Sequence, residues 1–225
     1  MIEPGRDAAV EPSQTRWARG GKRVFDVVGS LLMLVILSPL LLATVLAIKL
    51  SGRGPILFTQ IRSGRDGNAF LLYKFRTMRA TRTPDLKELV PLSHPDITRL
   101  GRWLRRTKID ELPQLFNVLS GEMSLIGPRP TLPDQVAQYD DFKRQRLLVR
   151  PGITGLAQVH GSTAIEWDER IRYDVYYVRH GSLKLDAWIL WRTVPTILFG
   201  EQHVACSFDD SFAGVSPTRP KSRSR

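Results

Sequence analysis

Two adjacent carboxylates, Asp110 and Glu111, are the residues of this chain whose types and setting best suit chemistry. Five cations precede them within one short stretch, namely Arg99, Arg102, Arg105, Arg106 and Lys108. A carboxylate that approaches a phosphate group is repelled by about 4 kcal/mol at a separation of ~4 Å and an effective dielectric of ~20. Guanidinium groups and a divalent metal cancel this repulsion and stabilise the oxygens of a transferring phosphoryl group. The pair therefore indicates nucleophilic chemistry at phosphorus, with Mg²⁺ as the natural metal for hard oxygen ligands.

The same residues also allow a structural interpretation. Asp110 is well placed to cap a helix over residues 110–119, in whose first turn Glu111 would complement the helix dipole. The arginines would then form a solvated face or a patch for acidic lipids. The carboxylates alone favour this interpretation, whereas the cations beside them favour the chemical one.

Arg129 is a further candidate because it lies within Gly127-Pro128-Arg129-Pro130. Prolines on both sides fix the backbone and pre-organise the guanidinium for bidentate phosphate binding. A rigid surface turn with an incidental arginine is the alternative. The motif RPGITG at residues 150–155 predicts a similar stiff turn, with a role in architecture rather than chemistry.

The charge of the chain narrows its partners. Thirty-three basic residues stand against 22 acidic ones, for a formal charge of +11, which favours phosphate-bearing substrates, acidic lipids or nucleic acid. Nucleic acid is not expected, because Trp103, Trp188 and Trp191 fall on apolar faces and do not interleave with basic residues. Cys206 is the single cysteine, which excludes an internal disulfide.

A long apolar segment must position these residues relative to a membrane. Residues 27–48 form a run of 22 without a charge, which as a straight helix would be about 33 Å long, enough to cross a bilayer. A buried helix of a soluble core is the alternative. Ser38-Pro39 lies at the middle of the run, where proline breaks or kinks a helix and serine can bond a freed carbonyl.

Basic residues flank this segment on both sides, so charge does not assign one end to the outside. We therefore predict a re-entrant helix-break-helix over residues 21–50 that enters and leaves by one face. A kinked spanning helix is the rival.

The remaining pattern predicts a mainly α fold with one small β-hairpin, over residues 56–62 and 70–76. Helices are expected over residues 96–106, 110–119 and 134–149. Residues 183–199 suit an interfacial amphipathic helix, and packing in the core is the alternative for this segment. The apolar residues of the first helix share one side, and those of the second should point inward. They are Ile97, Leu100, Trp103 and Leu104 on the first, and Leu112, Leu115, Phe116 and Leu119 on the second. A flexible tail is expected at residues 1–20 and a disordered basic tail at residues 201–225. Residues 51–200 are the expected main domain, which the family resemblance given next implies to be cytosolic and catalytic.

The chain resembles the bacterial sugar transferase family, the monotopic polyprenyl-phosphate phosphoglycosyl transferases, in its minimal form. The resemblance covers residues 22–200 and rests on motifs in a fixed order. These are KRVFD at 22–26, the apolar run with Ser38-Pro39, YKFRTM at 73–78, DELPQLFNVLSGEMSLIGPRP at 110–130, RPGITGLAQV at 150–159 and DVYYV at 174–178.

The resemblance implies an enzyme at the cytoplasmic face of the bacterial inner membrane. Asp110 would attack the β-phosphate of a UDP-sugar and release UMP, and polyprenyl (undecaprenyl) phosphate would then accept the sugar-phosphate. Glu111 is assigned to metal binding or proton handling, so Asp110 and Glu111 are the expected Mg²⁺ ligands. The residues expected to bind substrate phosphates are Arg105, Arg106 and Arg129.

The chain departs from the family pattern at Leu156, often tryptophan, at His160-Gly161-Ser162, often Asn-Gly-Arg, and at Glu122, often aspartate. The second departure places sugar or lipid recognition there in doubt. The competing hypothesis is a non-catalytic, membrane-anchored basic module that binds acidic lipid. Expected partners are a UDP-sugar, polyprenyl phosphate and membrane lipids; the sugar, the glycan pathway and a homodimeric state stay open.

Overall fold

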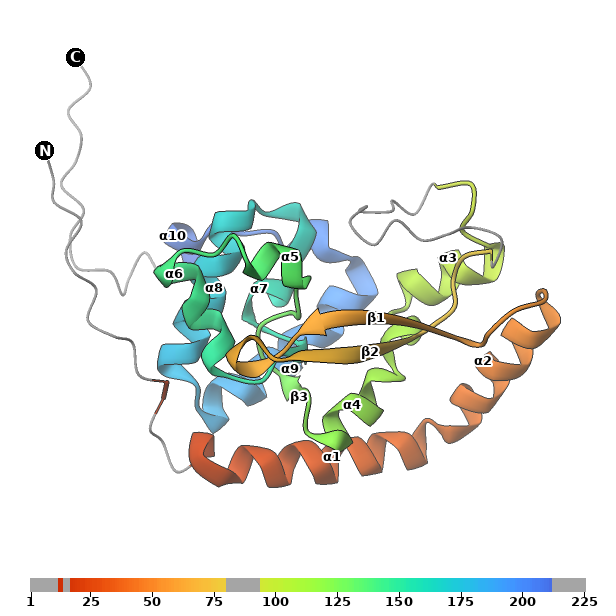
Figure 1. The fold of residues 1–225 in the computed structure, drawn as a ribbon, viewed down its shortest axis with the longest axis horizontal. Coiled ribbons are helices and arrows are strands. Elements are labelled where there is room, and N and C mark those ends of the chain that lie inside the picture. Colours follow the sequence, from red (N-terminus) through yellow and green to blue (C-terminus); the bar gives the residue numbers. More distant parts are fainter. Residues whose placement is uncertain (1–11, 14–16, 80–93, 212–225) are drawn as a thin grey trace, which may run out of the picture.

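The computed structural model describes residues 12–13, 17–79 and 94–211. The described chain is mainly helical and contains two small sheets. Figure 1 shows a long N-terminal helix along one edge of the molecule, a β-hairpin across its middle and the C-terminal helices grouped at one end.

The apolar segment forms two helices, α1 (Lys22–Ile36) and α2 (Ser38–Leu50), that are bent by 63° at Leu37. Pro39 occupies the first turn of α2, where its missing N–H costs no hydrogen bond. The Ser38 hydroxyl donates to the carbonyl of Val35 at 2.8 Å. The break therefore lies at the predicted Ser38-Pro39 pair, and serine makes the expected bond to a carbonyl.

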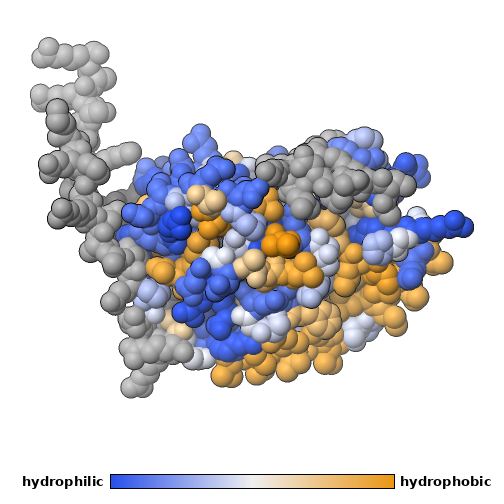
Figure 2. All heavy atoms as spheres, viewed as in Figure 1, coloured by the Kyte–Doolittle hydropathy of each residue, from blue (hydrophilic) through white to orange (hydrophobic). Residues whose placement is uncertain are grey.

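Large apolar side chains of α1 and α2 face solvent. On α1 they include Val28, Leu32, Val35 and Ile36, and on α2 they include Leu42, Leu46 and Leu50. In Figure 2 hydrophobic atoms line the lower edge of the molecule, where α1 runs in Figure 1. No single helix in the described chain is long and apolar enough to cross a membrane, whereas the bent pair passes as a unit by length and composition.

Both ends of the bent pair are tied to the rest of the domain. On α1, Arg23 donates to the carbonyls of Val118 and Leu119 at 2.6 and 2.9 Å. The buried Asp26 carboxylate accepts from the Leu125 N–H at 3.0 Å. At the far end of α2, Arg76 donates to carbonyls of Ile48, Gly52 and Arg53. The polar residues of KRVFD thus dock α1 on the domain.

The predicted hairpin is confirmed as β1 (Leu57–Ser63) and β2 (Ala69–Phe75), with Leu57 opposite Phe75 and Ser63 opposite Ala69. Its turn contains the short 3₁₀ helix Arg65–Gly67. Because side chains alternate between the two faces of a strand, Phe70, Leu72 and Lys74 share the inward face of β2. This alternation places one lysine in line with buried apolar residues.

The helices expected over residues 96–106 and 110–119 differ in detail. The first is α3 (Arg99–Arg106), and the second divides into a 3₁₀ turn, Ile109–Glu111, and α4 (Gln114–Ser120), with Pro113 between them. The prediction that Phe116 points inward was wrong, because this residue is 55% exposed. Trp103, on the apolar side of α3, is 50% exposed. Asn117 is buried instead, since its side chain bonds the backbone of Leu71 and Tyr73 on β2.

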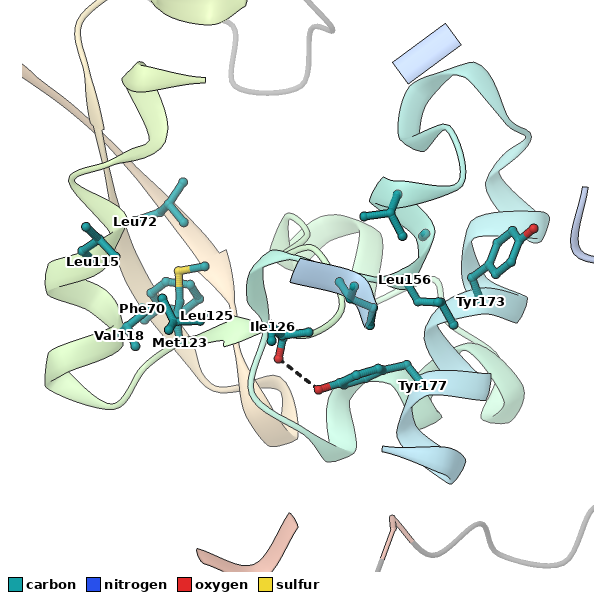
Figure 3. Close-up of a cluster of buried hydrophobic side chains, with 13 residues drawn as sticks. Phe70, Leu72, Leu115, Val118, Met123, Leu125, Ile126, Leu156, Tyr173 and Tyr177 are labelled. Carbon is teal, nitrogen blue, oxygen red and sulfur yellow. Dashed lines mark hydrogen bonds between the residues drawn. The ribbon is translucent and has the colours of Figure 1, made fainter. Parts of the chain in front are cut away.

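A parallel pair of strands that was not predicted, β3 (Ser124–Ile126) and β4 (Gly152–Thr154), lies at the centre. Gly127 and Gly152 let the two backbones approach closely: a Cβ on Gly152 would lie 2.1 Å from the Gly127 nitrogen. The motif RPGITG therefore has the architectural role expected of it. Around these strands, Figure 3 shows side chains of β2 and α4 on one side and of α7 and α8 on the other, with Ile126 between them and its carbonyl bonded to the Tyr177 hydroxyl.

The single helix predicted over residues 134–149 was wrong. The chain forms α5 (Pro133–Val136), α6 (Asp141–Arg144) and a 3₁₀ helix, Gln145–Leu148. The break arises because Asp140 caps α6 by accepting from the Lys143 N–H at 2.8 Å, and because Tyr139 turns inward and is only 7% exposed.

The C-terminal part contains α7 (Leu156–Val159), the 3₁₀ helix Ser162–Ala164, α8 (Trp167–His180) and α9 (Leu183–Phe199). The helix predicted over residues 183–199 is thus confirmed, and Trp191, Leu198 and Phe199 are exposed on it.

Parts of both predicted tails contact the domain. Ser13 bonds the carbonyls of Val178 and Gly181, and the π-helical turn Trp17–Gly21 holds Trp17 against Asp186. After α9, a 3₁₀ helix (Glu201–Val204) and α10 (Phe208–Ser211) follow. Residues 1–11, 14–16 and 212–225 of the two tails lie outside the described residues.

Candidate active site

Asp110 and Glu111 lie in a tight turn between α3 and α4. Lys108 has a left-handed backbone, with φ of 59°, which redirects the chain into the 3₁₀ helix that carries the pair. Asp110 is not a helix cap: Lys108 precedes the 3₁₀ helix and Pro113 precedes α4. The two side chains are buried, at 6% and 7% exposure. The capping interpretation of Asp110 is therefore wrong.

Glu111 joins three separate segments of the chain. Its Oε1 accepts from Lys74 Nζ of β2 and from Arg129 Nη2, each at 2.7 Å, and its Oε2 accepts from Arg129 Nη1 at 3.3 Å. Burial by itself would raise the pKa of Glu111, but Arg129 and Lys74 hold that pKa well below its usual range. Glu111 is therefore ionised and fully engaged by two cations.

Asp110 has the opposite character. Burial, together with the charge of Glu111, raises the pKa of Asp110 to about 6, although Lys74, Lys108 and Arg105 act against this shift. Among the residues that the structure describes, no hydrogen bond to the Asp110 carboxylate is found. Glu111 is thus anchored, whereas the Asp110 oxygens accept no hydrogen bond from the described residues. The pKa values of the two carboxyl groups are shifted in opposite directions, which is typical of functional pairs.

The arginines expected to bind phosphate do not all meet at the pair. Arg129 contacts Glu111 directly. Arg105 is half-buried, donates to the Thr77 hydroxyl at 2.9 Å and is close enough to influence the titration of Asp110. Arg106 is exposed, and no ion pair joins it to the two carboxylates in the described chain. The structure therefore brings Arg129 and Arg105 to the site but not Arg106.

The sequence did not indicate two further cations of the site. Lys74 is bonded to Glu111, and Arg62 of β1 lies beside Arg129, where burial and the Arg129 charge lower the pKa of Arg62 to about 10. Together they line a small hollow, whose other walls are Leu72, Gln114, Arg129 and Pro130. The available signal was Lys74 itself, a cation on a strand face that otherwise carries Phe70 and Leu72.

Glu201 is a third carboxylate at the edge of the site. It forms an ion pair with Lys108 at 2.8 Å and accepts from the N–H and hydroxyl of Thr163. Burial alone would raise the pKa of Glu201, but Lys108 keeps it low. No sequence signal marked this residue, because it lies beyond α9 in a segment expected to be disordered.

The carboxylates of the site can be compared with the ligands that a metal ion needs. No group of three metal-ligating side chains exists within the described ranges. Asp110 offers free oxygens, whereas both oxygens of Glu111 are taken by Arg129 and Lys74. Mg²⁺ commonly binds one or two carboxylates and completes its shell with water and substrate phosphates. The residues fit an ion held by Asp110 and by phosphate oxygens better than one held by both carboxylates.

Comparison with known proteins identifies the class. The chain matches the family model of bacterial sugar transferases over residues 17–200. It is 42% identical over 180 residues to the sugar transferase EpsL of Bacillus subtilis, a match that covers 80% of this chain and 88% of that protein. The chain therefore belongs to the bacterial sugar transferase family.

Relatives with more specific names are longer. The undecaprenyl-phosphate galactose phosphotransferase of Salmonella typhimurium is 40% identical over 198 residues, covering 81% of this chain and 41% of that protein. The undecaprenyl-phosphate glucose phosphotransferase of Komagataeibacter xylinus is 42% identical over 199 residues, covering 82% of this chain and 37% of that protein. This chain thus spans about two fifths of the length of these two relatives.

Proposed function

We propose that this chain transfers a sugar-1-phosphate from a UDP-sugar to undecaprenyl phosphate. The observation that carries the proposal is the carboxylate pair, in which Glu111 is anchored by Arg129 and Lys74 while Asp110 accepts no hydrogen bond from the part of the chain that the structure describes. The names of the relatives supply the acceptor and the type of group transferred.

Asp110 acts as the nucleophile in a two-step exchange. One of its oxygens bonds the β-phosphorus of the UDP-sugar, and the bond to the bridging oxygen breaks with its electron pair leaving on UMP. A phosphate oxygen of the polyprenyl acceptor then bonds the same phosphorus, and the acyl-phosphate bond between phosphorus and Asp110 breaks, with its electron pair returning to the carboxylate of Asp110. Covalent catalysis divides one hard displacement between two anions into two supported ones.

The pKa of Asp110 suits this role. A carboxyl with a pKa of about 6 is mostly ionised at pH 7, and it is more basic than an ordinary aspartate. Arg129, Lys74 and Arg62 supply positive charge on the other side of the pair, where phosphate oxygens would be bound. This arrangement lets an anionic nucleophile approach an anionic substrate.

Asp110 would hold Mg²⁺ together with oxygens of the diphosphate. When bound, it would neutralise charge on the diphosphate and polarise the reacting phosphoryl group. Glu111 would join it as a ligand only after giving up Lys74 or Arg129, so its main role is to hold these cations in place.

A membrane location follows from the acceptor and from the apolar surface. We propose that α1 and α2 enter and leave by the cytoplasmic face of the inner membrane, with α9 in the interface. A spanning helix would place one end on the far side of the bilayer. Here Arg23 ties one end of the pair to the domain, and Arg76 ties the other end to the same domain. This arrangement supports re-entry.

The test is turnover by the purified full chain in lipid nanodiscs, with Mg²⁺, undecaprenyl phosphate and a panel of UDP-sugars. The proposal expects release of UMP and formation of a lipid-diphospho-sugar with at least one donor. A folded, membrane-bound protein that turns over no donor would instead favour a non-catalytic basic module that binds acidic lipid.

A further inference from the structure

The backbone around Arg129 is held by a set of hydrogen bonds that has no part in the chemistry described above. Gly127 N–H donates to the Thr154 carbonyl at 2.9 Å, and Gly152 N–H donates to the Pro128 carbonyl at 2.9 Å. Strand β4 thus fixes the entry to the loop. The carbonyl of Arg129 itself is bound by a side chain, because Arg146 Nη2 donates to it at 2.8 Å.

Arg146 is buried and is itself held from two sides. Its Nη2 lies 2.6 Å from Asp174 Oδ2 of α8, and its Nη1 donates to the Tyr139 hydroxyl at 2.8 Å. The Tyr139 hydroxyl in turn bonds the Thr131 hydroxyl at 3.1 Å. Arg146 and Asp174 are only 4% and 2% exposed. One guanidinium therefore connects α8 to the loop both at Arg129 and, through Tyr139, at Thr131.

A buried ion pair is a weak device for stability, because the desolvation of two charges offsets most of their attraction. Its geometry is nevertheless specific, since the planar guanidinium presents its donors in a rigid fork. Here the fork points at the backbone of the residue whose side chain contacts Glu111. A shift of that backbone would move the Arg129 guanidinium relative to Glu111 and to any phosphate.

We propose that Arg146, oriented by Asp174, is a positioning residue that places the Arg129 guanidinium for phosphate binding. The inference rests on the proposed transferase function. Neither Arg146 nor Asp174 contacts Asp110 or Glu111 through a hydrogen bond or ion pair of the described chain, so their effect passes through Arg129.

The test is a double-mutant cycle on kcat/KM for sugar-phosphate transfer, measured with radiolabelled donor. Arg146→Lys keeps the positive charge beside Asp174 but loses the fork that reaches Arg129. We expect it to lower kcat/KM about tenfold or more in the wild-type background, and to change it less than twofold in the Arg129→Ala background. If the turnover of Arg129→Ala is too slow to detect, Arg129→Lys serves as the second background instead.

Thermal unfolding of the same proteins separates positioning from stability. Loss of Tm through Arg146→Lys should be equal in both backgrounds, because Arg146 bonds the backbone carbonyl of residue 129, which alanine retains. Tyr139→Phe is the milder variant, which removes only the hydroxyl between Arg146 and Thr131, and it serves where Arg146→Lys does not fold. Tyr173→Phe is the matched control: its hydroxyl on α8 bonds the Cys206 carbonyl and the Ser211 hydroxyl and not the Arg129 loop, so kcat/KM should stay unchanged.

The inference would be overturned if Arg146→Lys lowered kcat/KM by the same factor in both backgrounds. It would also be overturned if Tyr173→Phe lowered kcat/KM as much as Tyr139→Phe does. Absence of turnover in the wild-type protein would count against the proposed function instead, so the two failures are distinct.

Discussion

Arg129 binds both carboxylate oxygens of Glu111, with Nη2 at 2.7 Å from Oε1 and Nη1 at 3.3 Å from Oε2. This bidentate contact links the loop after β3 to the turn after α3. It also keeps Glu111 charged beside Asp110, and that charge is one reason why the pKa of Asp110 is raised. The contact thus connects the arginine proposed to bind phosphate with the pKa of the proposed nucleophile.

The pH profile should report on Asp110. Because the pKa of Asp110 is raised to about 6 and the carboxylate is the reactive form, kcat/KM should fall about tenfold per pH unit below pH 6 and level off above pH 7. Steady-state rates between pH 5 and 8.5 check this expectation. A profile that stays flat down to pH 5 would contradict it.

Asp110→Asn should abolish turnover and yet stabilise the fold at pH 7.5, by about 1–3 kcal/mol. The folded-state pKa of Asp110 lies above the ordinary value of 3.8, so wild-type stability is lost as the pH rises from about 4 through about 6. Because asparagine does not ionise, the Asp110→Asn protein does not lose this stability. The gain in free energy of unfolding should therefore shrink near pH 4.5, as measured by denaturant titration at both pH values.

Lys74→Met should lower kcat/KM about 100-fold or more, because it removes a buried cation from the phosphate side of the pair. It should also destabilise the fold, since Glu111 loses one of its two partners in a buried setting. Arg65→Gln is a suitable control at the exposed hairpin turn, with no expected effect on rate. Equal rates for Lys74→Met and wild type would exclude an electrostatic role.

Arg129→Ala should reduce the rate by about two orders of magnitude or more with the fold intact, whereas Arg106→Ala should change it less than about threefold. The difference follows from position, because Arg129 contacts Glu111 and Arg106 is exposed on α3. Comparison of kcat/KM for the two variants is the measurement. Similar losses of kcat/KM in the two variants would indicate that Arg106 also contributes to phosphate binding.

Labelling of single cysteines can test the membrane topology. In a Cys206→Ser background, cysteines at Gly5 and at Ser51 flank the bent pair, and neither should react with an impermeant thiol reagent on intact cells. Both should react after permeabilisation. Reaction of the Gly5→Cys protein from outside would show that the helices span the membrane.

The sequence alone predicted the parts of the structure that local chemistry determines. Residues Ser38 and Pro39 marked the helix break, and alternation marked the hairpin. The family resemblance assigned Asp110, Glu111 and Arg129 to one site, whereas the ion pair between Glu111 and Arg129 required the folded chain.

Other features depended on contacts between distant segments and were missed. The helix expected over residues 134–149 is interrupted because Tyr139 turns inward to bind Thr131 and Arg146, and no local pattern reports such a partner. Phe116 was placed inward because it is apolar, but Asn117 takes that place by bonding β2. Glu201 reaches Lys108 from beyond α9, across 93 positions in the sequence.

The most direct test of the account is to trap the proposed intermediate on Asp110. The purified protein is incubated with Mg²⁺ and an accepted UDP-sugar but without polyprenyl phosphate, and is then analysed by intact-protein and peptide mass spectrometry. We predict an adduct with the mass of one sugar-phosphate on the peptide that contains Asp110, with a stoichiometric burst of UMP and neither signal in Asp110→Asn. UMP release that requires the acceptor and leaves no adduct, or turnover retained by Asp110→Asn, would contradict the account.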